Sequence, residues 1–171
     1  LFVRMDTAVQ WCMSAKEVET VVLDARRRFW NPVRMEKARR TGLSLKDIHI
    51  LASIVEEETN NAEDRKMVAG VYLNRLKKRM PLQACPTARY ATGDFTLNRV
   101  LKKHTQIDSP YNTYKYAGLP PGPIRIPSGA AIDAVLDFIS HKYLYFCAKP
   151  DFSGTHNYAT NYVEHSRNAR A

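Results

Sequence analysis

Apolar side chains recur at helical spacing near the start of the chain, directly after a capping box formed by Ser14 and Glu17. The apolar positions are Val18, Val21, Val22, Ala25 and Phe29. This spacing predicts an amphipathic helix over about 15–30, and the Asn-Pro pair at 31–32 is expected to break it. A short basic connector should then lead to Gly42.

Two further helices are predicted in the first half of the chain. The first begins at Ser44, should end near 59–61, and carries an apolar stripe made of Ile48, Leu51, Ile54 and Val55. The second follows a capping pattern at 61–64 and continues over 67–76, where it is apolar almost all round. A helix that is apolar on every side is typical of a central position in the core.

Helical periodicity fades after Met80, and Pro, Thr, Tyr, Asn and Gly become frequent. The expected elements are a short helix over 96–103, a long stiff loop over 109–124, a helix over 128–138, a buried strand over 143–148, a turn over 151–154, a second strand over 155–159 and a closing helix over 161–169. Helices followed by a small sheet predict an α+β fold: a helical N-terminal half packed with a small antiparallel sheet and long loops rich in Pro, Tyr and Asn.

Composition narrows the class of protein. The 171 residues are 44% hydrophobic, which is ordinary for one globular domain and excludes collagen-like and low-complexity chains. Lys and Arg outnumber Asp and Glu by 26 to 17, which gives a net charge of +9. Such a charge favours an anionic partner as strongly as it favours a merely solvated basic surface. No nucleic-acid-reading helix or RNP-like strand is recognisable, so nucleic acid is not an expected partner.

Cysteine and histidine spacing gives no sign of a metal site. The three cysteines form no CxxC pair, and the five histidines lack the spacing of metal ligands. We therefore expect no metal site. The opening segment 1–6 resembles neither an initiator Met nor a signal peptide, so the chain is expected to be an excised fragment.

One acidic residue of the run 56–58 continues the apolar stripe of its helix. Glu58 follows Val55 by three positions and Ile54 by four, so helical phase places it on the buried side. Glu56 lies about 160° round the helix and should face solvent, and Glu57 should lie on the flank. Burial and the negative end of the helix raise a carboxyl pKa, which suits a general acid. A Glu that only caps or pairs is the equally weighted alternative.

Polar side chains of the second half are of the types that bind sugars. The candidates are Gln83, Thr87, Tyr90, Tyr111, Asn112, Thr113 and Tyr114. Aromatic faces cover sugar C–H groups, and amides and hydroxyls match sugar hydroxyls, although the same residues also build ordinary turns. Asn74, inside an apolar helix, is either a substrate ligand or, slightly favoured, a satisfied core amide. His156 is a further candidate, although a lone histidine is more often structural.

Several motifs occur together in one order along the chain. They are LASIVEEET at 51–59, VAGVYLNRL at 68–76, MPLQACPT at 80–87, SPYNTY at 109–114, GLPPGPI at 118–124, YLYF at 143–146 and Glu-His at 164–165. From about Asp47 to the C-terminus the chain resembles the endolytic murein transglycosylases, the MltG or YceG-like family. Residues 1–43 resemble it weakly and are expected to be a helical lead-in segment continuous with a catalytic domain over 44–171.

The resemblance implies a bacterial lyase that cuts MurNAc–GlcNAc bonds within nascent peptidoglycan strands and leaves 1,6-anhydro-MurNAc ends. The last acid of the family's Glu-x-Glu-Thr motif, its general acid/base, corresponds to Glu58, and no cofactor is implied. The family's glycan-contact positions correspond to Gln83, Thr87, Asn112, Thr113 and Tyr114. Cys85 departs from the family, which usually has Asp there, and a thiol cannot replace a carboxylate as acceptor or charge.

The resemblance also implies a place in the cell. Family members are usually anchored in the inner membrane by one helix, work on its periplasmic or outer side, and carry a LysM-like subdomain before the catalytic part. Neither that anchor nor a complete LysM-like subdomain is recognisable in this sequence. Peptidoglycan glycan strands are the expected partner, and cell-wall synthesis proteins stay open as others. The alternatives are a hydrolytic muramidase, which needs a second carboxylate, and a non-catalytic glycan- or nucleic-acid-binding module.

Overall fold

Four helices form the N-terminal half in the computed structural model, which describes residues 10–151 and 153–170. They are α1 (Ala15–Phe29), α2 (Pro32–Thr41), α3 (Leu45–Glu58) and α4 (Ala62–Lys77). The second half contains α5 (Cys85–Thr92), the 3₁₀ turn η1 (His104–Gln106), α6 (Gly129–Leu136), β1 (Tyr145–Ala148), β2 (His156–Ala159) and α7 (Tyr162–Asn168). The fold is α+β, as predicted. Positions 1–9 of the predicted lead-in and 152 of the predicted turn lie outside the described residues.

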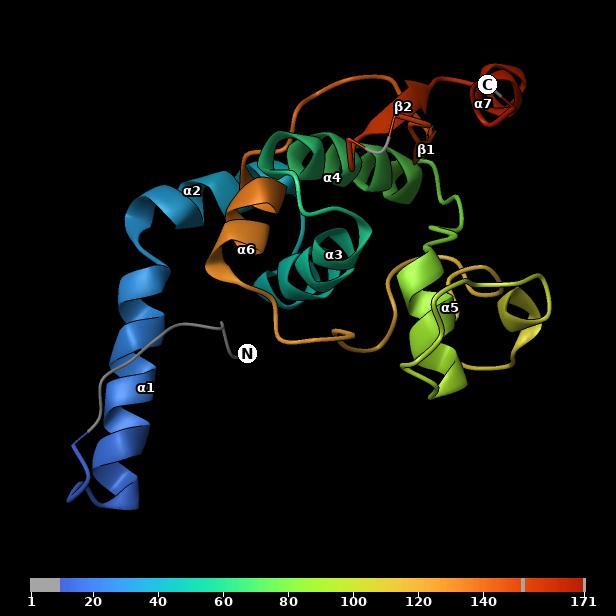
Figure 1. Ribbon diagram of the computed structural model, residues 1–171. Coiled ribbons are helices and arrows are strands. Elements are labelled where there is room, and N and C mark those ends of the chain that lie inside the picture. Colours follow the sequence, from blue (N-terminus) through green and yellow to red (C-terminus); the bar gives the residue numbers. More distant parts are fainter. Residues whose placement is uncertain (1–9, 152, 171) are drawn as a thin grey trace.

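The hydrophobic core lies between α3, α4 and α6. The stripe predicted for α3 is fully buried, because Ile48, Leu51, Ile54 and Val55 are all 0% exposed. α4 occupies the central place expected of a helix that is apolar all round, and it packs on α3, α6 and β1 (Figure 1). Burial of these apolar side chains is the main force that holds the helices together.

The predicted connector after position 31 is in fact a helix, α2. The Asn31 side chain accepts a hydrogen bond from the backbone N–H of Arg34, and Pro32 occupies the first turn. Proline is well tolerated there because the first turn needs no backbone donor. The Asn-Pro pair therefore ends α1 and begins α2, and Arg34 ties α2 to α6 through an ion pair with Asp133.

α1 extends away from the rest of the molecule (Figure 1). Its last residue, Phe29, is 8% exposed and belongs to the core cluster. The guanidinium of Arg34 lies 4.1 Å from the centre of the Phe29 ring, and Gly129 at the start of α6 also packs against that ring. α1 is thus anchored at its C-terminal end.

The second half differs from the prediction in two places. The expected helix over 96–103 is absent: this described segment has no helical residues, and the short 3₁₀ turn η1 begins directly after it. The helix α5 was not predicted, because helical periodicity fades after Met80; Pro86 in fact occupies its first turn. The stiff loop over 109–124 is confirmed as irregular backbone.

The two strands form an antiparallel pair in which Tyr145 lies opposite Ala159 and Phe146 opposite Tyr158. The prediction of a buried strand was wrong for β1, which is only half-buried and ends in exposed Ala148. One face of the pair packs on the core through Phe146 and Tyr158, while α7 packs against both strands.

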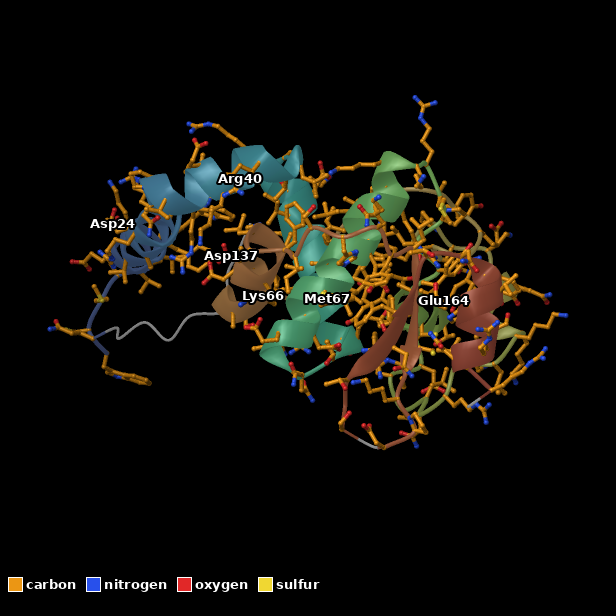
Figure 2. The ribbon with its side chains drawn as sticks, turned by 90° about the horizontal axis from the view of Figure 1, so that it is seen from above. Asp24, Arg40, Lys66, Met67, Asp137 and Glu164 are labelled. Atoms are coloured by element: carbon orange, nitrogen blue, oxygen red, sulfur yellow. The ribbon has the colours of Figure 1, made fainter. Side chains whose placement is uncertain are left out.

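No helix within the described residues is long and apolar enough to cross a membrane. Figure 2 shows Asp24 of α1 at one end of the molecule and Glu164 of α7 at the other. At the α7 end of the molecule, β1, β2 and α7 lie above the C-terminal part of α4 in the view of Figure 1, and α5 lies below it.

Candidate active site

Glu58 is the last residue of α3, and the following Thr59 has extended backbone. The phenol of Tyr72, on the neighbouring helix α4, donates a hydrogen bond of 2.5 Å to Glu58 Oε1. Tyr72 is 1% exposed, while Glu58 keeps part of its surface open. Helical phase therefore placed Glu58 correctly: it lies at the edge of the core and not in bulk solvent.

Burial raises the pKa of Glu58 to about 6. The hydrogen bond from Tyr72 and the charge of His156 oppose this rise, and the adjacent Glu57 adds to it. Burial, followed by the nearby Glu58 carboxylate, holds the pKa of the Tyr72 phenol well above its usual range, so Tyr72 stays a hydrogen-bond donor. A carboxyl with such a pKa can both give and take a proton near neutral pH.

Glu58 lies where cavities meet. One cavity of about 480 Å³, here named the α7 cavity, is lined by Glu58, Arg75, Leu82, Gln83, Cys85, Tyr114, Tyr145, Phe146, Tyr162 and His165. A second of about 320 Å³, the α5 cavity, is lined by Glu57, Glu58, Cys85, Pro86, Arg89, Leu97, Asn98, Arg99 and Val100. Glu58 and Cys85 line both, so a chain-like ligand could pass the carboxyl on either side. A third hollow of about 450 Å³ adjoins Glu58 beside 59–61 and the turn at 153–154.

Two of the predicted sugar-binding residues, Gln83 and Tyr114, line the α7 cavity with Glu58. Gln83 has a φ of 51°, a left-handed conformation that is uncommon for a residue with a side chain. Its backbone N–H donates to the carbonyl of Thr113, and its Oε1 accepts from Arg75 at 3.3 Å. The Tyr114 hydroxyl lies 3.2 Å from Cys85 Sγ. The strained backbone thus presents the Gln83 amide at the cavity wall.

Three other predicted glycan contacts are placed differently. Thr87, Asn112 and Thr113 are 0%, 0% and 1% exposed. The Asn112 amide donates to the carbonyls of residues 105 and 107, and the hydroxyls of Thr87 and Thr113 lie 2.7 Å apart. These side chains hold the loop behind Gln83 and Tyr114, because a buried polar group needs an internal partner. Their predicted role as direct contacts is corrected to support of the cavity wall.

Tyr90 and Asn74 also lie away from the two cavities that Glu58 and Cys85 share. The Tyr90 ring packs against Tyr111 and lines a smaller hollow with Glu57 and Arg125. The Asn74 amide donates to the backbone carbonyls of residues 141 and 143, at 2.8 and 3.0 Å. Asn74 is therefore the satisfied amide of the favoured interpretation, and it fixes the chain that leads into β1.

His156 is held by a buried acid. Its Nδ1 lies 2.7 Å from Asp64 Oδ2, and its backbone N–H donates to Asp64 Oδ1. The hydroxyl of Tyr158 donates to the same Oδ1 at 2.6 Å. Burial alone would raise the pKa of Asp64, but these hydrogen bonds outweigh it and hold the pKa below its usual range. His156 lies outside the lining of both named cavities, although its charge acts on Glu58.

The expectation that Glu56 faces solvent was wrong. Glu56 is 8% exposed, and its Oε2 accepts a hydrogen bond from the backbone N–H of Ser128 at 3.0 Å. Arg125, from the same distant segment, lies 3.6 Å from that oxygen. Glu57 pairs with both Arg89 and Arg125, which agrees with its predicted place on the flank. The segment before α6 therefore covers the face of α3 that helical phase had predicted to be exposed to solvent.

Sequence reasoning missed several residues that line the site. Tyr72 and Arg75 come from the buried face of α4, while Tyr145, Tyr162 and His165 come from β1 and α7. Arg75 is 7% exposed, and its donors are used by the carbonyls of residues 81, 82 and 144. The motifs at 143–146 and 164–165 were the available signal for the aromatic residues. No group of three possible metal ligands gathers anywhere in the described ranges.

Comparisons with known proteins give a consistent picture. The profile of the YceG-like family matches residues 7–171. An endolytic murein transglycosylase of Bacillus subtilis (strain 168) is 46% identical over 111 residues, which is 65% of this chain and 31% of that protein. A protein of the same name from Streptococcus pneumoniae (strain D39) is 42% identical over 130 residues, which is 74% of this chain and 23% of that protein.

A solved structure resembles the whole fold. The crystal structure of a YceG-like protein from Listeria monocytogenes matches with a TM-score of 0.78 and 33% sequence identity. The match covers 95% of this chain and 52% of that one. The chain thus spans about a third or less of the length of the curated relatives that it matches.

Proposed function

The chain belongs to the YceG-like family, and on that premise we propose that it is the catalytic part of an endolytic murein transglycosylase. The substrate is a peptidoglycan glycan strand, and the bond cut is the one between MurNAc and GlcNAc within the strand. The names of the relatives from Bacillus subtilis and Streptococcus pneumoniae support this substrate class. The observation that carries the proposal is the position of Glu58, at the meeting point of two cavities and with its pKa raised to about 6.

Glu58 acts as both acid and base. Its carboxyl donates a proton to the oxygen that bridges MurNAc and GlcNAc, and the bond from that oxygen to the MurNAc anomeric carbon breaks. The resulting carboxylate takes the proton of the C6 hydroxyl on the same MurNAc, whose oxygen then bonds to the anomeric carbon. No water is consumed, and the product ends in 1,6-anhydro-MurNAc. Because the attacking hydroxyl belongs to the bound sugar, its effective concentration is high.

Muramidase chemistry is the second candidate. Such hydrolysis requires another carboxylate, either to activate water or to form a covalent intermediate. Glu57 precedes Glu58 in the chain, and its two carboxylate oxygens are bound by Arg89 and Arg125, so neither is free to hold an attacking water. Cys85, at the position where the family usually has Asp, supplies a thiol instead. The described linings of the two cavities hold no unpaired acid besides Glu58, which favours the intramolecular C6 hydroxyl as nucleophile.

Digestion of purified peptidoglycan tests the proposal. We expect a spread of glycan lengths whose MurNAc ends resist reduction by borohydride and whose masses lack one water per cut. Reducing MurNAc ends that carry oxygen-18 from labelled solvent would instead support the muramidase.

Glu58→Gln is the decisive variant. Gln keeps the acceptor for Tyr72 but cannot cycle a proton, so turnover should fall by about 10²- to 10⁴-fold while glycan binding persists. Glu36→Gln is the matched control, since Glu36 is exposed on α2 and pairs only with Arg39. Glu56→Gln would be a poor control because Glu56 is buried against Ser128. Equal rates for Glu58→Gln and the parent protein would refute the assignment.

The same relationship leads us to propose where the protein acts. Peptidoglycan strands are polymerised outside the cytoplasmic membrane, so a domain that cuts them must act on the periplasmic or outer side. We propose that the full-length protein is held at that membrane by one anchoring helix. Fractionation of cells, followed by protease treatment of spheroplasts, would test this: a catalytic domain protected from protease would contradict it.

A further inference from the structure

We propose that Tyr162, supported by Tyr145 and His165, forms a subsite on which a hexosamine ring of the glycan stacks within the α7 cavity. The inference rests on the proposed function, because the same cavity holds Glu58. The subsite assigns a function to α7 and to the histidine of the Glu-His motif at 164–165. Neither takes part in the acid–base chemistry of Glu58.

The three rings form one rigid cluster. The rings of Tyr145 and His165 are stacked, with centroids 5.4 Å apart and planes 24° apart. The guanidinium of Arg75 lies 5.1 Å from the centre of the Tyr145 ring, and the backbone carbonyls that Arg75 binds fix its position. Two neighbours, His165 and Arg75, therefore hold the Tyr145 ring in place. Tyr162 completes the cluster, with its centroid 6.1 Å from Tyr145 and 6.0 Å from His165.

Tyr162 leaves most of its surface open at the edge of the cavity. Its side chain is 67% exposed, and its recorded ring contacts are those with Tyr145 and His165. No residue of α7 is buried. A large aromatic ring gains little stability in such a position, whereas an open ring face beside a cavity suits the C–H face of a pyranose.

Polar atoms beside these rings lack partners among the described residues. His165 Nδ1 is buried without a hydrogen bond. The Tyr145 hydroxyl and the Gln83 amide nitrogen, on the wall of the same cavity, also have no recorded partner within the described ranges. Burial and the charge of Arg75 lower the pKa of His165, which keeps its ring neutral at physiological pH. Neutral donors and acceptors next to a ring face match the hydroxyl and acetamido groups of a hexosamine.

The two sides of Glu58 differ in chemistry. The described lining of the α5 cavity includes Arg89 and Arg99 but no aromatic ring. Stacking is therefore possible on the α7 side alone, and a sugar ring held there would lie next to the bond that Glu58 protonates. The subsite thus sets the depth at which the strand enters the cleft.

Binding of chitohexaose, the uncharged β-1,4-linked hexamer of N-acetylglucosamine, tests the subsite. The measurement uses Glu58→Gln as the parent, so that no turnover occurs, and isothermal titration as the readout. We expect Tyr162→Ala to weaken binding by about three- to tenfold, the fold-change that corresponds to the loss of one ring contact. Tyr162→Phe should restore most of it, because the ring face is kept.

Tyr116→Ala is the matched control. Tyr116 is an exposed tyrosine, 47% exposed, that binds Asp108 and lines neither cavity, so its loss should leave binding unchanged. Tyr162→Ala should also raise KM for peptidoglycan strands in the Glu58 enzyme and leave kcat within about twofold. Thermal unfolding of Tyr162→Ala should match that of the parent, since the residue is exposed.

The outcomes separate this inference from the proposed function. If the enzyme cleaves peptidoglycan but Tyr162→Ala binds chitohexaose as tightly as the parent, the subsite is refuted and the function stands. If the enzyme does not cleave but binds the hexamer through Tyr162, the function fails and the subsite stands as part of a glycan-binding module. If it neither cleaves nor binds, both are refuted.

Discussion

Opposing influences act on the proton of Glu58. Burial disfavours the carboxylate, while the Tyr72 hydroxyl and the charge of His156 favour it. The balance leaves the pKa at about 6, so roughly one carboxyl in ten is protonated at pH 7. A general acid with this pKa loses activity as pH rises through about 6, because its protonated fraction falls about tenfold per pH unit above that value.

Tyr72→Phe should move this pH limb upward. The hydrogen bond from Tyr72 stabilises the charged form, so its removal raises the pKa of Glu58 further above its ordinary value. The alkaline limb of the kcat/KM profile should shift to higher pH by about half a unit or more. Tyr116→Phe, on an exposed loop, serves as control. A downward shift in Tyr72→Phe would show that Glu58 is not the group that limits activity at high pH.

At the scale of elements, α4 connects the core to the site. Its buried side packs on α3 and α6, and its Tyr72 and Arg75 reach Glu58 and the α7 cavity. The close packing of α4 against the segment after α6 depends on Gly70. A Cβ added there would lie 2.4 Å from the carbonyl oxygen of Ile139 and 2.6 Å from His141 Nε2.

Gly70→Ala should therefore destabilise the protein, although alanine is the better helix former. We expect a loss of about 1–3 kcal/mol in the free energy of unfolding, because backbone must move to admit the methyl group. Gly42→Ala is the comparison: nothing lies within 4 Å of its added Cβ, and only its φ of 72° opposes the change, at a cost of about 1 kcal/mol. Urea unfolding of both variants measures this. A Gly70→Ala protein as stable as the parent would contradict the packing.

At the scale of the whole molecule, the charge is strongly positive. The net charge of +9 creates a field that attracts anionic ligands over distances set by ionic strength. Peptidoglycan carries carboxylates on its stem peptides, while the sugar backbone of chitohexaose is neutral. The α7 cavity is lined in part by residues of β1 and α7. Figure 2 shows Glu164 of α7 at the end of the molecule opposite Asp24 of the protruding helix α1.

Salt should accordingly weaken binding to peptidoglycan. We expect KM for peptidoglycan strands that carry stem peptides to rise severalfold as NaCl increases from about 50 to about 500 mM, because screening shortens the reach of the charge. Binding of chitohexaose to Glu58→Gln is the internal control and should hardly change. A KM that does not depend on salt would show that net charge has no part in substrate capture.

Much of the fold could be predicted from local pattern. The capping residues and apolar stripes located α1, α3, α4 and α6. The same phase predicted that Glu58 continues the stripe of α3, and Glu58 lies half-buried there, bound to Tyr72. Turn residues located the hairpin and α7. These features depend on residues three or four positions apart, and such spacing can be read directly from the sequence. The Pro of α2 was misleading because proline ends one helix and begins another equally well.

The rest was decided by contacts between segments far apart in the chain. Glu56 is buried because Arg125 and Ser128 cover it from about 70 positions away, which helical phase cannot show. Asn112 serves the loop instead of the cavity for a more local reason: its amide binds carbonyls five and seven positions earlier, which only the folded loop brings within reach. By itself, the sequence determined α1, α3, α4, α6 and α7, the α+β class and the acid at the end of α3. Only the tertiary structure decided which polar side chains face the cavities, because a polar group's role depends on which partners packing brings to it.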